Sequence, residues 1–213
     1  MTKEENQLDT LIQEIESNSK DKKRYLISIS GAPGCGKSTF SAFLKNRLKD
    51  AAIIQMDGFH LENTVLNDKK IIERKGSPET FDVEGLESLI KRAKTQTSDF
   101  IYAPFFNREL DSSIGSAIEI SKDIKYILVE GNYLLLDEKP WSDLNTLFDY
   151  KIFLDVDEET TIKRLTERWL DLGLDKDQTL KKVFGNDMRN FKKVSENLLS
   201  YDFRLKGEIK INE

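Results

Sequence analysis

The stretch "SISGAPGCGKSTFS" (residues 28–41) contains the spacing G-x-x-x-x-G-K-[ST] of a phosphate-binding loop. In such a loop, glycines let backbone N–H groups turn toward an anion, and the helix that follows adds positive potential. The lysine, here Lys37, reaches the β- and γ-phosphates of a nucleotide, and the hydroxyl of Ser38 binds Mg²⁺. The loop residues expected to bind the nucleotide are Gly31, Ala32, Pro33, Gly34, Cys35, Gly36, Lys37 and Ser38.

Both flanks of this motif have the structure that a phosphate-binding loop requires. The residues before it, "YLISIS" (25–30), are apolar or β-branched and predict a buried strand. The residues after it predict a helix over 37–49, because apolar side chains recur on one helical face: Phe40, Phe43, Leu44 and Leu48. The alternative is a glycine-rich turn with an incidental lysine. It would not explain the motif spacing or the strand and helix patterns on either side.

The rest of the chain alternates between strand-like and helical patterns, which indicates an α/β fold with a parallel sheet covered by helices. Asp82 is an expected N-cap for the helical pattern "DVEGLESLIKRAK" (82–94). The polar C-terminal segment 175–200 predicts helix broken at Gly185. Further strands are predicted at "AAIIQM" (51–56), "FIYAPF" (100–105), "AIEI" (117–120), "KYILVEG" (125–131), "YKIFLDV" (150–156) and "YDFRLK" (201–206), with another helix from Glu158.

Length and composition favour one domain over residues 1–213, with an N-terminal helical extension at 1–20. A charged fraction of 33%, the absence of a long apolar run and the absence of a signal sequence predict a cytoplasmic protein without membrane association. The net charge of −5 argues against a nucleic-acid partner, and we interpret the lysines at 20–24 and 181–182 as solvated surface. The single Cys35 excludes an intrachain disulfide.

Two carboxylates follow predicted buried strands, at the sheet edge where ligands bind in open α/β folds. Asp57, in "MDGFH" (56–60), is positioned to accept the proton of an attacking hydroxyl, although Asp-Gly is also a common turn. Glu130, in "KYILVEGNYLL", is positioned to hold Mg²⁺ directly or through water, although it could instead cap a helix.

Five blocks together resemble the phosphoribulokinase/uridine kinase/bacterial pantothenate kinase superfamily, and most of all its bacterial nucleoside/nucleotide kinase-like, fructokinase-like branch. The blocks are "GAPGCGKST", "MDGFHL", "RKGSPETFDV", "PFFNRELD" and "VEGNYLLLD", and the resemblance covers residues 24–205. It implies a P-loop kinase fold with a five-stranded parallel core sheet flanked by helices, a small strand or hairpin extension, and a helical lid at about 160–185. It also implies ATP and Mg²⁺ as co-substrate and metal.

By this resemblance Asp57 matches the catalytic base, Glu130 the metal-associated carboxylate, and Lys37, Ser38 and Thr39 the nucleotide loop. The lid helix "IKRLTERWLDLG" implies that Arg164 and Arg168 face the phosphates, with Arg168 stabilising the transferred group; each could equally form a surface ion pair. Trp141 and Trp169 are expected to be packing residues. The resemblance further places these residues beside the acceptor: His60, Arg74, Lys75, Asp82 and Arg108. A structural His60 is an equal alternative.

The expected function is ATP- and Mg²⁺-dependent transfer of the γ-phosphate to a hydroxyl of a small metabolite, such as a sugar, a nucleoside or a pantothenate-like compound. We expect a monomer or a homodimer. The alternative is a nucleoside-triphosphate hydrolase with no dedicated acceptor. A GTPase switch would need an Asn-Lys-x-Asp guanine reader, which the chain lacks. The two carboxylates argue against a regulatory module without turnover.

Overall fold

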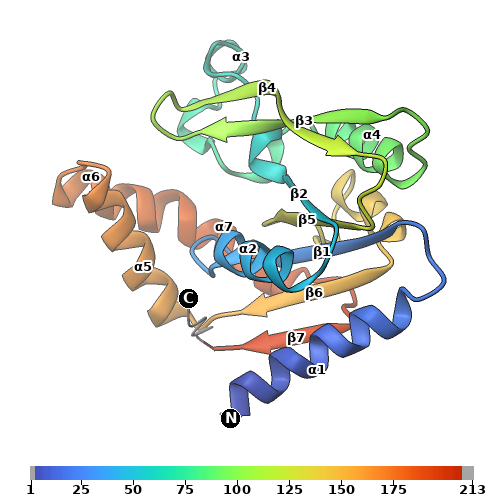
Figure 1. The fold of residues 1–213 in the computed structure, drawn as a ribbon. Helices are drawn as coiled ribbons and strands as arrows, with labels where there is room; N and C mark the ends of the chain where they lie inside the picture. Colours follow the sequence, from blue (N-terminus) through green and yellow to red (C-terminus); the bar gives the residue numbers. More distant parts are fainter. Residues whose placement is uncertain (1–2, 208–213) are drawn as a thin grey trace.

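The computed structural model describes residues 3–207 and has a central sheet of five parallel strands in the order β2-β5-β1-β6-β7 (Figure 1). The expectation of a five-stranded parallel core flanked by helices is confirmed. All strands point the same way, so their carboxyl ends meet at one edge, where ligands bind in open α/β sheets. The strands are β1 (Tyr25–Gly31), β2 (Ala51–Gln55), β5 (Tyr126–Gly131), β6 (Tyr150–Asp155) and β7 (Phe203–Lys206).

Apolar cores cover both faces of this sheet, because successive side chains of each buried strand point to opposite faces. Ile27 and Ile29 belong to a core under α1 and α2, whereas Leu26 belongs to a core under α4. The predicted N-terminal helix therefore packs on the sheet through an apolar stripe that includes Leu11 and Ile15, both fully buried. These helices are α1 (Lys3–Asn18), α2 (Lys37–Arg47) and α4 (Val83–Lys94).

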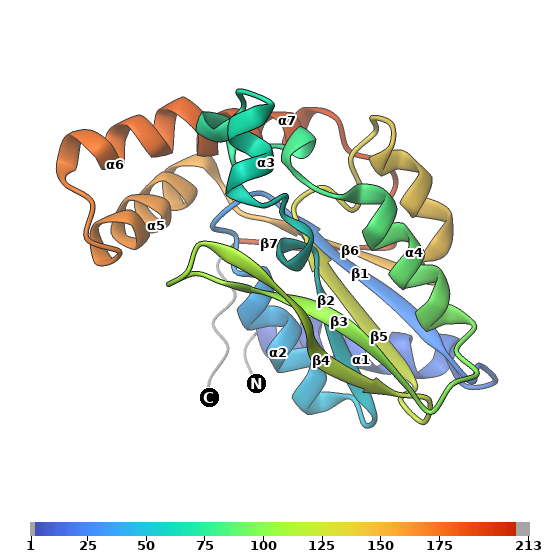
Figure 2. The same ribbon diagram turned by 90° about the horizontal axis from the view of Figure 1, so that it is seen from above.

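A two-stranded antiparallel hairpin forms the predicted extension and lies over the β2 side of the sheet (Figure 2). Its strands are β3 (Phe100–Asn107) and β4 (Ser112–Ser121). The inward side chains Ile101, Ala103 and Ile120 join the same core as α4. The short helix α3 (Asn63–Asp68) lies beside this hairpin (Figure 2).

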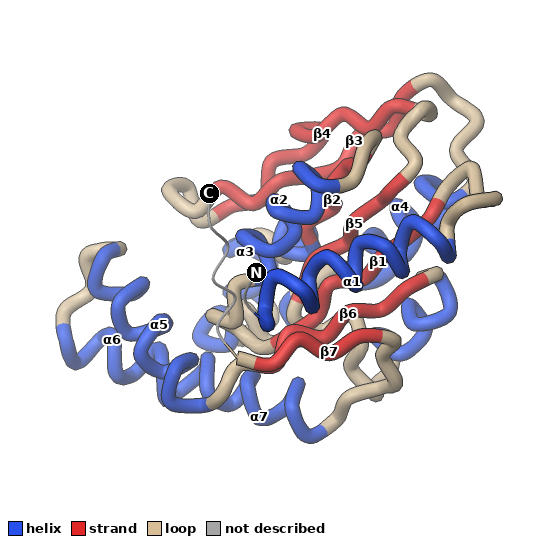
Figure 3. Tube along the Cα trace, turned by 60° about the horizontal axis from the view of Figure 1, so that its bottom comes forward, coloured by secondary structure: helices blue, strands red, loops and turns tan. Residues whose placement is uncertain are grey.

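Helices α5 (Glu158–Asp171) and α6 (Lys176–Lys182) project from the body of the molecule and lead into α7 (Met188–Glu196) (Figure 3). The predicted break at Gly185 is wrong, because the chain stays helical there as a π-helical turn over Val183–Asp187. Val183 and Met188, at the two ends of this turn, are both buried against Leu165 of α5. Packing on both sides of the turn thus holds the chain helical through Gly185.

No helix among residues 3–207 combines the length and apolar character required to cross a lipid bilayer.

Candidate active site

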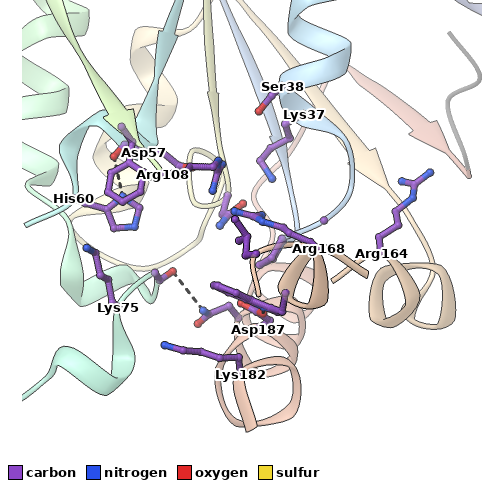
Figure 4. A pocket seen from close by; sticks show the side chains of 18 of the residues that line it. Lys37, Ser38, Asp57, His60, Lys75, Arg108, Arg164, Arg168, Lys182 and Asp187 are labelled. Carbon is purple, nitrogen blue, oxygen red and sulfur yellow. Dashed lines mark hydrogen bonds and ion pairs between the residues drawn. The ribbon is translucent and has the colours of Figure 1, made fainter. Parts of the chain in front are cut away.

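A cavity of about 670 Å³ lies at the carboxyl ends of the parallel strands, between the phosphate-binding loop, the hairpin and the lid helices (Figure 4). Its walls come from segments that are far apart in the sequence, from residue 33 to residue 190. The structure brings together most of the residues singled out in the sequence. Those that line the cavity are Pro33, Gly34, Gly36, Lys37, Ser38, Thr39, Asp57, His60, Lys75, Arg108, Glu130, Arg164 and Arg168.

The loop between β1 and α2 has the backbone of a phosphate cradle. Gly34 and Gly36 adopt φ angles of 75° and 92°, a region that only glycine enters without strain. Lys37, the first residue of α2, turns back so that its Nζ donates to the carbonyl oxygens of Gly31 (3.0 Å) and Ala32 (2.9 Å). The ammonium group is thereby held within the loop, where phosphate oxygens would bind.

Ser38 and Glu130 form a polar pair beside Lys37. The Ser38 hydroxyl donates to Glu130 Oε1 at 3.0 Å, and Glu130 is only 5% exposed at the end of β5. Burial raises the pKa of Glu130 and the nearby Asp57 raises it further, whereas Lys37 and the Ser38 hydrogen bond act in the opposite direction. A hydroxyl and a carboxylate next to a phosphate site are the oxygen donors that Mg²⁺ uses when it keeps several waters and phosphate ligands. The donor set therefore fits Mg²⁺.

Asp57 lies on a short 3₁₀ turn, Met56–Phe59, directly after β2. Gly58 allows the hairpin to approach this turn, because a Cβ there would lie 2.6 Å from the Pro104 carbonyl oxygen. The approach brings Arg108 to Asp57, and Arg108 Nη2 donates to Asp57 Oδ2 at 3.2 Å. The Asp-Gly pair is thus both a turn and the point where the base candidate meets a cation from the hairpin.

His60 has the contacts of a structural residue that positions Asp57. Its Nδ1 lies 2.8 Å from the Asp57 carbonyl oxygen, and its ring lies between Phe81 (centroids 4.1 Å apart) and Phe106 (4.6 Å). Burial lowers the pKa of His60, with smaller opposing effects from Asp57. A neutral, packed imidazole supports the turn that presents the Asp57 carboxylate.

The three charged residues of the "RKGSPETFDV" block go to different places. Lys75 lines the cavity, and its Nζ donates to Asn63 Oδ1 (2.7 Å) and to the Asp111 carbonyl oxygen (2.6 Å). Arg74 and Asp82 are not among the cavity-lining residues. Arg74 donates to Asn186 Oδ1 at 2.8 Å. Asp82 accepts from the Gly85 N–H at 2.9 Å as the N-cap of α4. Arg74 and Asp82 therefore do not line the cavity that contains Asp57 and the phosphate-binding loop.

Arg168 and Arg164 occupy different parts of the cavity although they lie one turn apart on α5. The guanidinium of Arg168 lies next to that of Arg108, whereas that of Arg164 is directed away from it (Figure 4). Burial lowers the pKa of Arg168 and the nearby Arg108 lowers it further, while Asp57 acts in the opposite direction. Arg164 Nη1 lies 4.0 Å from the position of a Cβ on Gly36, beside the phosphate loop.

Six residues of the helical segment from α5 to α7 line the cavity but were not assigned to it from the sequence: Trp169, Leu172, Leu174, Lys182, Asp187 and Asn190. Trp169 Nε1 donates to Asp187 Oδ2 at 2.7 Å, so a residue expected to be packing is also part of the cavity wall. Lys182, interpreted as solvated surface, points to the same cavity. The π-helical turn sets the register of Asp187 and Asn190 relative to α6, and no local motif signals that turn.

We predict that Asp187→Asn raises the stability of the folded protein at pH values above those where carboxyl groups ordinarily titrate. Burial raises the pKa of Asp187 above its usual 3.8, so the folded chain binds that proton more tightly than the unfolded chain. Its contribution to stability is therefore greatest at low pH and is lost as the pH rises through the raised pKa. Asparagine retains an acceptor for Trp169 without the buried charge. Each 1 kcal/mol regained raises Tm by about 2–4 °C in a chain of this size.

Thermal unfolding at pH 8 and at pH 4 would measure this effect, with the exposed Asp68→Asn as the control. The gain should be present at pH 8 and shrink at pH 4. A lower Tm for Asp187→Asn at pH 8 would mean that the electrostatic attraction of Asp187 to Arg168 and Lys182 outweighs the cost of burial.

Comparison with known proteins places this site in a family. Residues 26–201 match the phosphoribulokinase/uridine kinase family. A Schizosaccharomyces pombe protein provisionally named a uridine kinase is 33% identical over 87% of this chain and 84% of its own. A pantothenate kinase of Enterococcus faecalis is 31% identical over 68% of this chain, which spans 49% of that protein.

A crystal structure from Silicibacter sp. TM1040, of a protein provisionally named a fructose transport system kinase, superimposes with a TM-score of 0.88. The two chains are 36% identical, and the match covers 96% of this chain and 99% of that one. Phosphoribulokinase from Rhodobacter sphaeroides, at 16% identity and a TM-score of 0.56, shares the fold. With its phosphate-binding loop, parallel sheet and helical lid, the chain belongs to the phosphoribulokinase/uridine kinase family of P-loop kinases.

Proposed function

We propose that the protein transfers the γ-phosphate of ATP to a hydroxyl group of a small metabolite, with Mg²⁺ as the metal. The observation that supports this most is that one cavity contains both the phosphate-binding loop and Asp57. A kinase needs the nucleotide and a base for the attacking hydroxyl on facing sides of one site. Asp57 also influences the pKa of Glu130, so the candidate base and the candidate metal-binding carboxylate are electrostatic neighbours.

In this proposal Asp57 accepts the hydroxyl proton as the acceptor oxygen forms a bond to the γ-phosphorus and the bond to the ADP oxygen breaks. Lys37 and Arg168 face the charge on the transferred group, and electrostatic stabilisation of this kind is usually the largest contribution to such a reaction. Mg²⁺ held by Ser38 and Glu130 would neutralise charge on the phosphate oxygens. His60 positions Asp57 through its backbone carbonyl.

Arg108 completes the proposed site from the hairpin. Its ion pair with Asp57 holds the carboxylate in place, with the Arg108 and Asp57 side chains 48% and 32% exposed. The Arg108 guanidinium lies next to that of Arg168 (Figure 4), and in this proposal it leaves the Asp57 carboxylate to bind a phosphate oxygen when the substrates are present. Arg164, beside Gly36, is proposed to contact the nucleotide rather than the transferred group.

The names of the relatives suggest acceptors that have hydroxyl groups, namely uridine, pantothenate and fructose. The test is ATP consumption by the purified chain with mixtures of sugars, nucleosides, polyols and hydroxy acids, with the phosphorylated product identified by mass. Acceptor-dependent ADP formation with a matching product supports a kinase. Release of free phosphate at a rate that no acceptor changes would instead indicate a nucleoside-triphosphate hydrolase.

We predict that Glu130→Gln raises the Mg²⁺ concentration for half-maximal activity by about 10–100-fold, the range seen when groups that support a metal site are removed. The amide keeps the size of the side chain and can still accept from Ser38, but it lacks the negative charge that attracts the cation. A magnesium titration at saturating ATP measures the shift, and Glu16→Gln on the exposed face of α1 is the remote control. An unchanged Mg²⁺ dependence would make Glu130 structural.

A further inference from the structure

A second cavity of about 600 Å³ adjoins the proposed active site and shares two lining residues with it. It lies between the segment at Glu73 and Arg74 and the helical segment from α6 to α7. Leu174 and Lys182 line both cavities. The two spaces therefore meet at Lys182, and a molecule with its hydroxyl at Asp57 could extend past Lys182 into the second cavity.

The walls of this second cavity are strongly basic. Its charged lining consists of one acid, Glu73, and four cations: Arg74, Lys181, Lys182 and Arg189. Lys181 lies 4.0 Å from Glu73, and both side chains are 81% exposed, so their pairing neutralises little of this charge. Arg74 is held by Asn186 Oδ1 at 2.8 Å and by Glu79 at 3.6 Å. The surplus positive charge favours an anionic occupant.

Lys182 is the cation at the junction that has no anion bound to it. Among residues 3–207, its ammonium group has no hydrogen-bond partner and no carboxylate within ion-pair distance, although the nearby Asp187 interacts with it electrostatically. It lies 5.8 Å from the centroid of the Trp169 ring. The other two lysines of the catalytic cavity have partners: Lys37 donates to the loop carbonyls, and Lys75 is engaged by Asn63 and Asp111. A partly buried ammonium group whose donors are unused is the group that an incoming anion would meet.

The position of Lys182 assigns this anion to the acceptor and not to ATP. Lys37 and Ser38 mark the nucleotide side of the cavity, and Lys182 lies away from them, on the side where Lys75 also projects (Figure 4). The phosphates of ATP are already provided for by the loop and by Arg168. The positive charge of Lys182, at the acceptor side of the cavity, then calls for a second anion, which the acceptor would carry.

Resting on the proposed kinase function, we propose that the acceptor is an acidic hydroxy compound whose carboxylate or phosphate binds Lys182 at the junction of the two cavities, with its hydroxyl at Asp57. Neutral polyols and nucleosides of similar size lack this contact and are poor acceptors.

The experiment compares pairs of compounds that differ in charge: gluconate with sorbitol for the carboxylate, and ribose 5-phosphate with ribose for the phosphate. Binding is measured by calorimetry with a non-hydrolysable ATP analogue present, and product formation is followed separately with ATP. The variants are Lys182→Met and, as the matched control, Lys163→Met, an exposed lid lysine that lines neither cavity.

At least one acid should bind at least tenfold more tightly than its neutral partner. Lys182→Met should lower the affinity for that acid by about 10–100-fold, as expected for the loss of a charge-assisted hydrogen bond. The affinity for the ATP analogue should stay within about twofold of wild type. Lys163→Met should change neither. The stronger of the two acids shows whether carboxylate or phosphate is preferred.

Equal binding of acidic and neutral partners, or acid binding that Lys182→Met leaves unchanged, would overturn the acidic acceptor. A Lys182→Met variant that loses the ATP analogue instead would assign Lys182 to the nucleotide and overturn it as well. These outcomes are separate from failure of the kinase itself. If only neutral compounds are phosphorylated, the kinase function stands and the acidic acceptor is rejected. If an acid binds through Lys182 but no phosphorylated product forms, the anion site stands and the kinase function is rejected.

Discussion

Lys37→Ala is expected to lower kcat by about 10²–10³-fold, the effect of removing one preorganised group that stabilises transition-state charge. It should also weaken ATP binding by about 10–100-fold, since a hydrogen bond to a charged group contributes about 1.5–3 kcal/mol. Lys37 is 9% exposed and held at the loop carbonyls, so it acts in a site where little water screens its charge. Steady-state kinetics with ATP titration measures both effects.

The controls separate chemistry from folding. Removing Lys37 leaves the carbonyl oxygens of Gly31 and Ala32 without their ammonium donor, which could loosen the loop. Lys37→Met keeps the aliphatic stem, and its Tm shows whether the fold is intact. Lys45→Ala removes an exposed lysine from the same helix and should behave as wild type. Normal turnover in a folded Lys37→Ala protein would contradict phosphoryl transfer at this loop.

Asp57→Asn is expected to lower kcat for acceptor phosphorylation by about 10²–10⁴-fold, the usual contribution of a general base. Asparagine keeps the size of the side chain and can still accept from Arg108, but it cannot take up the hydroxyl proton. ATP affinity should change little, because the nucleotide is proposed to bind the loop across the cavity. Product and free phosphate are measured separately, with Asp68→Asn as the exposed control.

Stability should be almost unchanged in Asp57→Asn, since an ion pair with both partners this exposed contributes at most about 1 kcal/mol. A variant that phosphorylates the acceptor at the wild-type rate would remove Asp57 from the chemistry. His60 would then be an unpromising replacement, because its ring is packed between two phenylalanines and its Nδ1 is engaged by the Asp57 carbonyl. Loss of phosphate release without any acceptor product would instead indicate that Asp57 positions water.

The central part of the fold could be predicted because its signals are local. Apolar strands followed by amphipathic helices predicted the parallel sheet, including its short last strand β7, and the N-cap at Asp82. The one clear error in the fold was the predicted helix break at Gly185, which was inferred from the low helix propensity of glycine. Packing of Val183 and Met188 against α5 keeps that segment helical, and this contact is between distant residues that local propensity does not describe.

The sequence by itself determined the phosphate-binding loop, and it placed Asp57 and Glu130 at strand ends, because motif spacing and strand periodicity both act over a few residues. Only the tertiary structure decided which other charges share the cavity. It brought Arg108 to Asp57 across 51 residues, placed Asp82 at a helix N-cap and Arg74 in the wall of the adjoining cavity, and added the lid residues. The physical reason is that a side chain's role here depends on which distant element packs against it, and in the lid that register is set by one π-helical turn.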